Sequence, residues 1–321
     1  MSSGVGAIPS EVSAEVSAGV DAAGIAVVGP TAVGKSDLAV ALAQVVGGEI
    51  VNGDSMQLYR GMDIGTAKLT APERAGVPHH LLDVLDVRED ANVAAYQAAA
   101  LDVVAQIRGR GHVPVLVGGS GLYVAAVVSG LDFPGTDPVV RARLEADLAE
   151  QGAPALHARL ASVDPEAAAS ILATNGRKLV RALEVVEVSG GPFRAVLPEL
   201  GSEGPDGWLR IGVTAPRPEL AARIEARVDR MWAQGLVDEV RRLEKDGIRE
   251  GRTAARALGY AQVLRFLAGT GTQERARAET ISSTRRFVRR QESWFSRDPS
   301  IHWLPYDADD LVARALTLWT G

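Results

Sequence analysis

Short apolar runs alternate with segments of helical periodicity over the first part of the chain. Apolar runs at residues 25–28 and 113–117 predict buried strands, and a short strand is expected at residues 49–52. The spacing of Leu and Ala positions between them predicts helices over residues 37–46 and 94–107. A strand–helix–strand–helix–strand succession of this kind is typical of a parallel sheet with right-handed crossovers.

The rest of the chain predicts mostly helices. Residues 137–189 contain no strand pattern, and a Gly- and Pro-rich run leads from residue 190 to residue 207. The apolar run 208–213 then predicts a further core strand. Everything after Val213 has helical periodicity, over residues 219–246, about 256–267 and 274–296.

A glycine-rich segment connects the first predicted strand to the first predicted helix and reads G-x-x-x-x-G-K-S. It consists of Gly29, Pro30, Thr31, Ala32, Val33, Gly34, Lys35 and Ser36. In this context the pattern predicts a P-loop, whose backbone N–H groups and helix N-terminus form an anion cradle. Lys35 adds a positive charge for phosphate oxygens, and Ser36 offers a hydroxyl to Mg²⁺. The loop therefore predicts a phosphorylated ligand and leaves open whether that ligand is a nucleotide.

These patterns together predict an α/β fold, with a P-loop parallel-sheet core, a helical insertion domain and a helical C-terminal part. We expect residues 1–24 to be a disordered extension, because they are rich in Ser, Ala, Val and Gly. The core domain is expected over residues 25–131 and 207–321, and the insertion over residues 132–206.

The cysteine content and the charge of the chain exclude several kinds of functional site. The 321 residues include no cysteine, which excludes disulfides, zinc-thiolate sites and cysteine nucleophiles. The chain has a net charge of −6, but residues 223–297 carry 17 Lys and Arg against 10 Asp and Glu, which favours one anion-facing surface. With no basic leader and no 18-residue apolar run, we expect a cytoplasmic protein without membrane spans.

Several side chains near the predicted P-loop are candidates for chemistry. Asp54 follows the second strand, and either holds water on Mg²⁺ or acts as a general base. Ser120 follows the third strand, where a helix cap is favoured over a substrate contact. Arg223 is near enough to a helix start to reach the phosphate site. Arg227 and Arg230 are expected on a solvated face, paired with neighbouring acidic residues.

The last long helix carries a cationic ridge. Phe287 and Trp294 are seven residues apart and are expected to face the core. Four arginines stand beside them without an acidic residue among them, at positions Arg285, Arg286, Arg289 and Arg290. A phosphate backbone is the natural partner of such a ridge.

The whole pattern resembles the bacterial tRNA dimethylallyltransferases. The matching segments extend from about residue 25 to residue 304 and read GPTAVGKS, GDSMQLYRGMDIGTAK, PHHLLDV, VPVLVGGSGLY, RALEV, ARALGY and RRQESWF. The resemblance implies transfer of a dimethylallyl group from dimethylallyl diphosphate to the exocyclic amine of the adenosine 3′-adjacent to the anticodon of tRNA. It also implies Mg²⁺ as cofactor, and we expect a monomer. A small-molecule or nucleotide kinase is the alternative that the P-loop alone would suggest.

The same resemblance implies roles for individual residues. The loop from Gly29 to Ser36 would bind the diphosphate, with Lys35 and Arg223 as catalytic cations and Asp54 as general base. The implied tRNA contacts are Asp54, Ser55, Met56, Gln57, Ser120, Arg141, Arg177, Lys178, Arg181, Arg256, Arg289, Arg290 and Gln291. The chain departs from the family pattern at Asn175, where relatives commonly have an acidic residue, and at Ser120, where threonine is usual.

Overall fold

The computed structural model describes residues 24–131, 133, 135–193 and 207–320. These residues fall into two compact units, a larger one from residues up to 130 and from 207 onward, and a smaller one from residues 131–193. The extension expected over residues 1–24 lies outside the described residues, except for Gly24, which begins the first strand.

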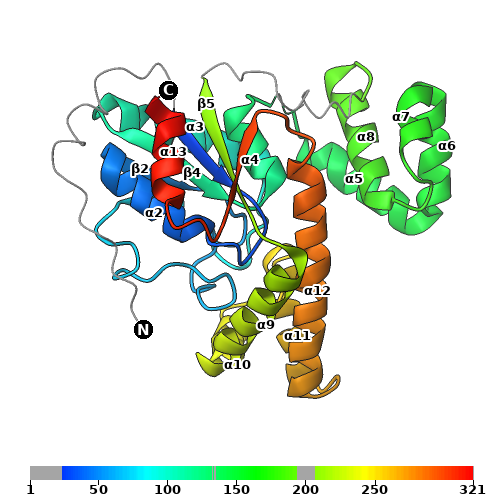
Figure 1. Cartoon of the computed structure of the whole chain (residues 1–321). Helices are drawn as coiled ribbons and strands as arrows, with labels where there is room; N and C mark the ends of the chain where they lie inside the picture. The colour runs from blue at the N-terminus through cyan, green and yellow to red at the C-terminus, as the bar shows by residue number, and fades with distance from the viewer. Residues whose placement is uncertain (1–23, 132, 134, 194–206, 321) are drawn as a thin grey trace. The chain divides into compact units, whose positions relative to one another are not determined.

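A six-stranded parallel sheet forms the centre of the larger unit, in the order β3-β2-β4-β1-β5-β6 (Figure 1). The strands are β1 (Gly24–Val28), β2 (Gly48–Asn52), β3 (His79–His80), β4 (Val113–Gly118), β5 (Trp208–Thr214) and β6 (Ile301–Pro305). The predicted α/β class with a parallel sheet is confirmed.

Helices cover both faces of the sheet, and alternate residues of β1 face the two layers. Ile25 and Val27 pack in one core with α2 and α13, whereas Ala26 and Val28 pack in another with α3 and α4. The helices of these two layers are α2 (Lys35–Val46), α13 (Leu311–Thr320), α3 (Val93–Gly109) and α4 (Gly121–Val128). Figure 1 shows α2 and α13 together on one face of the sheet.

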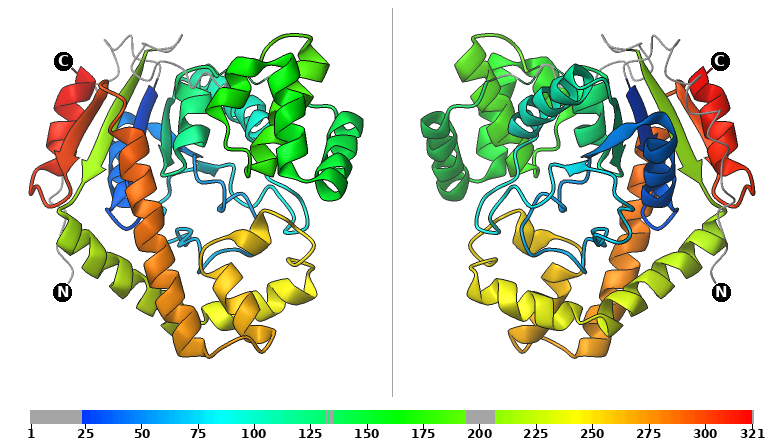
Figure 2. Two further views of the ribbon diagram at one scale, coloured as in Figure 1. Left: turned by 90° about the vertical axis from the view of Figure 1, so that its right-hand side faces the viewer. Right: turned by 90° about the vertical axis from the view of Figure 1, so that its left-hand side faces the viewer.

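A second group of helices extends from the carboxyl end of β5, and α12 runs from the sheet to this group in Figure 2. The group contains α9 (Arg217–Ala233), α10 (Leu236–Lys245), the 3₁₀ turn η1 (Ala254–Arg256), α11 (Tyr260–Leu267) and α12 (Gln273–Phe295). The single helix predicted over 219–246 is wrong, because the chain breaks at Gly235, whose φ of 97° is left-handed. A core of its own joins Leu236 and Tyr260 to Tyr59 and Met62 of the segment after β2.

The expectation that everything after Val213 is helical is also wrong, because β6 adds a strand beside β5. Only Ile301 of this strand is fully buried. An exposed edge strand of five residues lacks the apolar run that reveals a central strand, so the sequence gives little sign of it.

The smaller unit is helical in the residues that the structure describes. It contains α5 (Pro138–Gln151), α6 (Ala153–Val163), α7 (Pro165–Ser170) and α8 (Gly176–Ser189). Asp137 and Asp164 cap the helices that follow them, and both positions precede a proline. Leu144, Leu160 and Leu183 belong to the core that the four helices enclose. No helix in the described part of the chain is long and apolar enough to cross a membrane.

A buried ion cluster stands at the start of β2. Glu49 is 4% exposed and accepts hydrogen bonds from Arg110 Nη2 at 2.8 Å, His112 Nδ1 at 2.6 Å and His80 Nε2 at 2.5 Å. The bonds from Arg110, with help from the two histidines, lower the pKa of Glu49 to about 2 against the opposing effect of burial. The ionised carboxylate therefore joins β2 to the end of α3 and to the segments that carry the two histidines.

We expect Glu49→Gln to lower the free energy of unfolding at pH 7 by up to about 3 kcal/mol. The pKa of Glu49 is lower in the folded protein than in the unfolded chain, so its contribution is present above pH 4.5 and is lost as the pH falls toward 2. Urea unfolding at pH 7 and pH 3 measures the difference. Asp102→Asn, which changes an exposed carboxylate of α3, is the control. A stability loss that does not shrink at low pH would contradict this account.

Candidate functional site

The candidate site lies at the carboxyl edge of the sheet, where three neighbouring strands end. In the order β2-β4-β1, the P-loop follows β1, the segment 53–57 follows β2 and the turn 118–121 follows β4. A hydrogen bond of 2.7 Å from Gly53 N to the Val117 carbonyl joins the segment after β2 to the end of β4. Parallel strands bring these loops together at the edge where α/β proteins bind their ligands.

The P-loop has the backbone that its glycines predict. Gly29 has a φ of 137°, and a Cβ atom there would lie 2.4 Å from the Val213 carbonyl oxygen, so a larger residue does not fit. Gly34 has a φ of 107°. Ala32 also adopts a left-handed φ, of 70°, which is unusual for a residue with a side chain. The loop is thus held in a conformation that it would not adopt alone.

The ammonium group of Lys35 is held by a backbone carbonyl and, among the described residues, not by a carboxylate. Its Nζ donates a hydrogen bond of 2.7 Å to the Pro30 carbonyl. Removal from water and, to a smaller degree, the charge of nearby Arg227 lower the pKa of Lys35 to about 7, while the charge of Asp54 opposes the shift. An anion bound in the loop would raise this pKa and favour the charged ammonium.

Arg223 of α9 lies against the P-loop. Its Nε donates a hydrogen bond of 2.8 Å to the carbonyl of Ala32, the residue with the left-handed backbone. The guanidinium also stacks over the Tyr306 ring, with 4.7 Å between Cζ and the ring centroid. Tyr306 was not singled out from the sequence, because it follows the unpredicted strand β6.

Arg227 also faces the site, and the expectation of a solvated face is wrong for it. The side chain is half-buried, and its Nη2 donates a hydrogen bond of 3.2 Å to the Thr66 carbonyl. Burial lowers the pKa of Arg227, while the charge of Asp54 opposes the shift. Arg230, one turn further along α9, is exposed as expected. The acidic neighbours do not pair with these arginines, because Glu225 contacts Arg285 and Asp229 contacts Arg277, both on α12.

Asp54 stands in a turn that Asn52 organises. The Asn52 side chain accepts a hydrogen bond from Asp54 N at 2.9 Å and donates one to the Asp54 carbonyl at 3.0 Å. Oδ1 of Asp54 accepts the Met56 N–H at 2.9 Å. No described residue forms a hydrogen bond with the second oxygen, Oδ2. The carboxylate is therefore oriented through one oxygen and retains the other for a ligand.

Ser120 is at the N-cap position of α4, but its side chain forms no capping hydrogen bond. The favoured cap role is therefore wrong for the hydroxyl. Its oxygen lies 3.5 Å from both the backbone nitrogen and the hydroxyl of Ser55. In the same segment, Gln57 donates a hydrogen bond of 3.2 Å to the carbonyl of Thr66. Ser120 and Ser55 thus lie side by side, and Gln57 lies next to Asp54, whose carbonyl accepts the Gln57 N–H at 3.2 Å.

A buried carboxylate fixes the segment that follows. Glu239 of α10 is 2% exposed and accepts the backbone N–H groups of Asp63, Ile64 and Gly65 at 3.2, 2.8 and 3.1 Å. The Tyr260 hydroxyl donates a further bond of 2.6 Å to it. A Cβ atom on Gly65 would lie 2.4 Å from the Tyr260 ring, so only glycine fits there. The sequence gives no sign of this contact, since Glu239 has the helical position of an ordinary surface acid.

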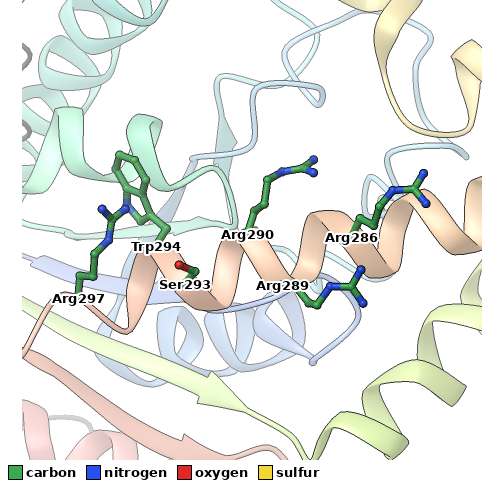
Figure 3. Close-up of a pocket in the computed structure, with 6 residues that line it drawn as sticks. All are labelled: Arg286, Arg289, Arg290, Ser293, Trp294 and Arg297. Atoms are coloured by element: carbon green, nitrogen blue, oxygen red, sulfur yellow. The ribbon is translucent and has the colours of Figure 1, made fainter. Parts of the chain in front are cut away.

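The ridge of α12 borders an open pocket, shown in Figure 3. Trp294 lies under the Arg297 guanidinium, 5.1 Å from Cζ to the ring centroid, and Arg290 lies 5.6 Å from the Phe287 ring. The lining residues are Arg286, Arg289, Arg290, Ser293, Trp294 and Arg297. We call this open pocket the groove of α12. Arg285, the fourth arginine of the predicted ridge, does not line it.

The buried face of α12 lies one residue further along the helix than expected, at Val288 and Phe295 in place of Phe287 and Trp294. Phe287 and Trp294 are only half-buried, and the buried positions in this half of the helix are Thr284, Val288, Gln291 and Phe295. Gln291, an implied tRNA contact, is thus inside the protein. Among the other implied contacts, Arg256, Arg289 and Arg290 are exposed.

The implied tRNA contacts of the smaller unit divide into two kinds. Arg141 and Arg181 both bind the fully buried carboxylate of Glu184, Arg141 Nε at 3.1 Å and Arg181 Nη1 at 2.8 Å. Arg177 and Lys178 are exposed in the first turn of α8. Asn175, the departure from the family pattern, caps this helix by accepting the Lys178 N–H at 3.2 Å.

The site has few protein ligands for a metal. No group of three or more His, Asp or Glu residues that could hold a metal ion occurs in the described ranges. Mg²⁺ does not require one, because it binds to one or two protein oxygens together with phosphates and water. The Ser36 hydroxyl has no hydrogen-bond partner among the described residues, so it is available as such an oxygen. The donor set therefore fits Mg²⁺ held jointly with a phosphorylated ligand.

Comparison with known proteins identifies similar chains. A model of the IPP transferase family matches residues 57–298. The tRNA dimethylallyltransferase of Thermobifida fusca (strain YX) is 68% identical over 299 residues, which is 92% of this chain and 93% of that protein. The tRNA dimethylallyltransferase of Streptomyces griseus is 61% identical over 297 residues, covering 92% and 95% of the two chains.

Two solved structures share the fold. The tRNA isopentenylpyrophosphate transferase of Bacillus halodurans is 40% identical, has a TM-score of 0.68, and covers 91% of this chain and 94% of its own. A eukaryotic dimethylallyltransferase acting on tRNA is 23% identical with a TM-score of 0.77, over 92% of this chain and 77% of its own. The second likeness concerns the fold alone.

Proposed function

The chain belongs to the IPP transferase family, and we propose that it transfers the dimethylallyl group of dimethylallyl diphosphate to tRNA. The acceptor is the exocyclic amine of the adenosine 3′-adjacent to the anticodon, and the product is N6-dimethylallyladenosine. The observation that carries this proposal is the position of Asp54, an oriented carboxylate with a free oxygen, beside a P-loop lined by Lys35, Arg223 and Arg227. A phosphorylated donor and a nucleophile that needs a base would meet there.

The P-loop binds the diphosphate of the donor. Backbone N–H groups and the N-terminus of α2 provide the anion cradle, and Lys35 and Arg223 bring positive charge from two directions. Negative charge accumulates on the diphosphate as the bond between C1 and oxygen breaks. Donors that are already fixed in place stabilise this charge without reorganising, which is the largest contribution that the loop can make.

Asp54 is the general base. An adenine amine is a weak nucleophile, since its lone pair is delocalised into the ring. As N6 forms its bond to C1 of the dimethylallyl group, the diphosphate leaves with the electron pair and Oδ2 of Asp54 accepts the proton from N6. The hydrogen bond from Met56 N to Oδ1 holds the carboxylate in the orientation that this transfer needs.

Mg²⁺ fits beside the loop with the Ser36 hydroxyl as its protein ligand. When bound, it would add positive charge on the diphosphate oxygens. Lys35 and Arg223 already bring positive charge to the P-loop. The metal and these two side chains would therefore stabilise the same negative charge on the diphosphate. The target adenine must leave the base stack of the tRNA to reach Asp54. Ser55, Gln57 and Ser120 are available to contact this extruded base, since they lie in the turns next to Asp54.

The groove of α12 supports binding of the tRNA backbone. The guanidinium groups of Arg289 and Arg290 are exposed, and Trp294 offers an aromatic surface in the same groove. Cations and aromatic rings together are the usual means of binding RNA loops. Arg177, Lys178 and Arg256 are further exposed cations that would contact tRNA.

We expect Asp54→Asn to lower kcat by about 10²- to 10⁴-fold, because the amide cannot accept the N6 proton. The amide oxygen can still accept the Met56 N–H, so the turn and both substrate affinities should be retained. Purified enzyme is incubated with unmodified tRNA and dimethylallyl diphosphate. After digestion of the tRNA, N6-dimethylallyladenosine is quantified by mass spectrometry as a function of time. Asp102→Asn is the control for loss of an exposed carboxylate. Full activity of Asp54→Asn would remove Asp54 as the base, and wild-type enzyme without dimethylallyladenosine would refute the proposed function.

We expect Arg290→Ala to weaken tRNA binding and to reduce the slope of log affinity against log salt by about 1. The reason is the loss of one phosphate contact and of the ions that it releases. Arg314→Ala, which removes an exposed arginine from α13, should leave affinity and slope unchanged. Filter binding at several salt concentrations measures both. An unchanged slope for Arg290→Ala would show that this arginine is only solvated.

A further inference from the structure

The carboxamide of Gln291 connects two loops of the site. Gln291 is on the buried face of α12 and is 5% exposed. Its Oε1 accepts the backbone N–H of Thr31 in the P-loop at 2.9 Å, and its Nε2 donates to the carbonyl of Gly119 at 2.9 Å. A single side chain thus holds the loop after β1 and the turn after β4 at a fixed separation.

The turn after β4 is shaped to receive this side chain and its neighbour. A Cβ atom on Gly119 would lie 2.4 Å from Gln291 Nε2, and one on Gly121 would lie 2.2 Å from the Trp294 ring. Both glycines therefore leave the space that α12 side chains fill. Ser120 lies between them, and its hydroxyl is beside Ser55. The position of this hydroxyl consequently depends on the contact with α12.

The P-loop is held from two helices at consecutive residues. Gln291 of α12 holds the Thr31 N–H, and Arg223 of α9 holds the carbonyl of Ala32, whose backbone is left-handed. A left-handed alanine is strained, and such strain persists only when surrounding contacts fix the conformation. The two contacts fix the loop on either side of the peptide that precedes Ala32. Without Gln291, Thr31 would lose its partner and this part of the loop would relax.

We propose that Gln291 is a positioning residue for the donor site, and that it sets the P-loop conformation that binds the diphosphate. This inference rests on the proposed function, since it takes the loop to be the site of the donor. Gln291 acts through Thr31 and Gly119 and does not itself touch either substrate. Both polar atoms of its carboxamide are already hydrogen-bonded within the protein, so it has little left to offer to tRNA. Its neighbours Arg289 and Arg290 face the groove instead.

The test compares Gln291→Met with Gln291→Ala. Methionine preserves the volume of the side chain and removes both hydrogen bonds, so it separates positioning from packing. Gln262→Ala is the matched control, because Gln262 is equally buried and its side chain accepts the Gly259 N–H at 2.9 Å, away from the P-loop. Thermal unfolding, tRNA affinity, the kinetics for dimethylallyl diphosphate and calorimetric binding of inorganic diphosphate are measured for each.

We expect both Gln291 variants to raise the KM for the donor and the Kd for inorganic diphosphate by about tenfold. Their tRNA affinity should change by less than about twofold, and Gln262→Ala should change neither constant. Reduced tRNA affinity with an unchanged donor KM would overturn the proposal, because Gln291 would then be a tRNA contact. Lower melting temperature with unchanged constants would also overturn it. Failure of the wild-type enzyme to modify tRNA would refute the function instead, and diphosphate binding would still test the role of Gln291.

Discussion

The neighbouring positions of β2, β4 and β1 in one parallel sheet are the constraint on which the site depends. Each strand delivers one loop to the same edge, so the P-loop, Asp54 and the turn around Ser120 meet without long connections. The central strands themselves are buried between two helical layers. Function then requires only that the loops be fixed relative to one another. Gln291 does this from outside the sheet for the P-loop and the turn after β4, and Glu239 holds the backbone of residues 63–65 in the segment that follows β2.

Electrostatics gives this edge its chemical character. Lys35, Arg223 and Arg227 point toward it, and each donates a hydrogen bond to a backbone carbonyl. Carbonyls orient the cations, and no carboxylate among the residues that the structure describes forms an ion pair with them. Asp54 is the acidic group whose charge both Lys35 and Arg227 sense. A site with excess positive charge and one oriented carboxylate suits a reaction in which an anion departs and a proton is removed.

Local patterns revealed much of the fold. The P-loop and the central strands were predictable, because apolar runs and glycine spacing determine them within a few residues of sequence. The directions of Arg227, Phe287 and Trp294 were predicted wrongly, since the direction of a helical side chain depends on which face the rest of the fold covers. Glu239 was missed because its partners are about 175 residues away in the chain. Strand β6 was missed because its single fully buried residue leaves no pattern.

The central claim is that the P-loop binds the diphosphate of a prenyl donor. A crystal structure of the enzyme soaked with an unreactive thiolo analogue of dimethylallyl diphosphate, in parallel with one soaked with ATP, tests it most directly. We expect diphosphate density enclosed by the backbone of residues 29–36, with Lys35 and Arg223 in contact and the prenyl chain directed toward Asp54. A nucleoside triphosphate ordered in the loop, with the analogue absent from it, would contradict the account.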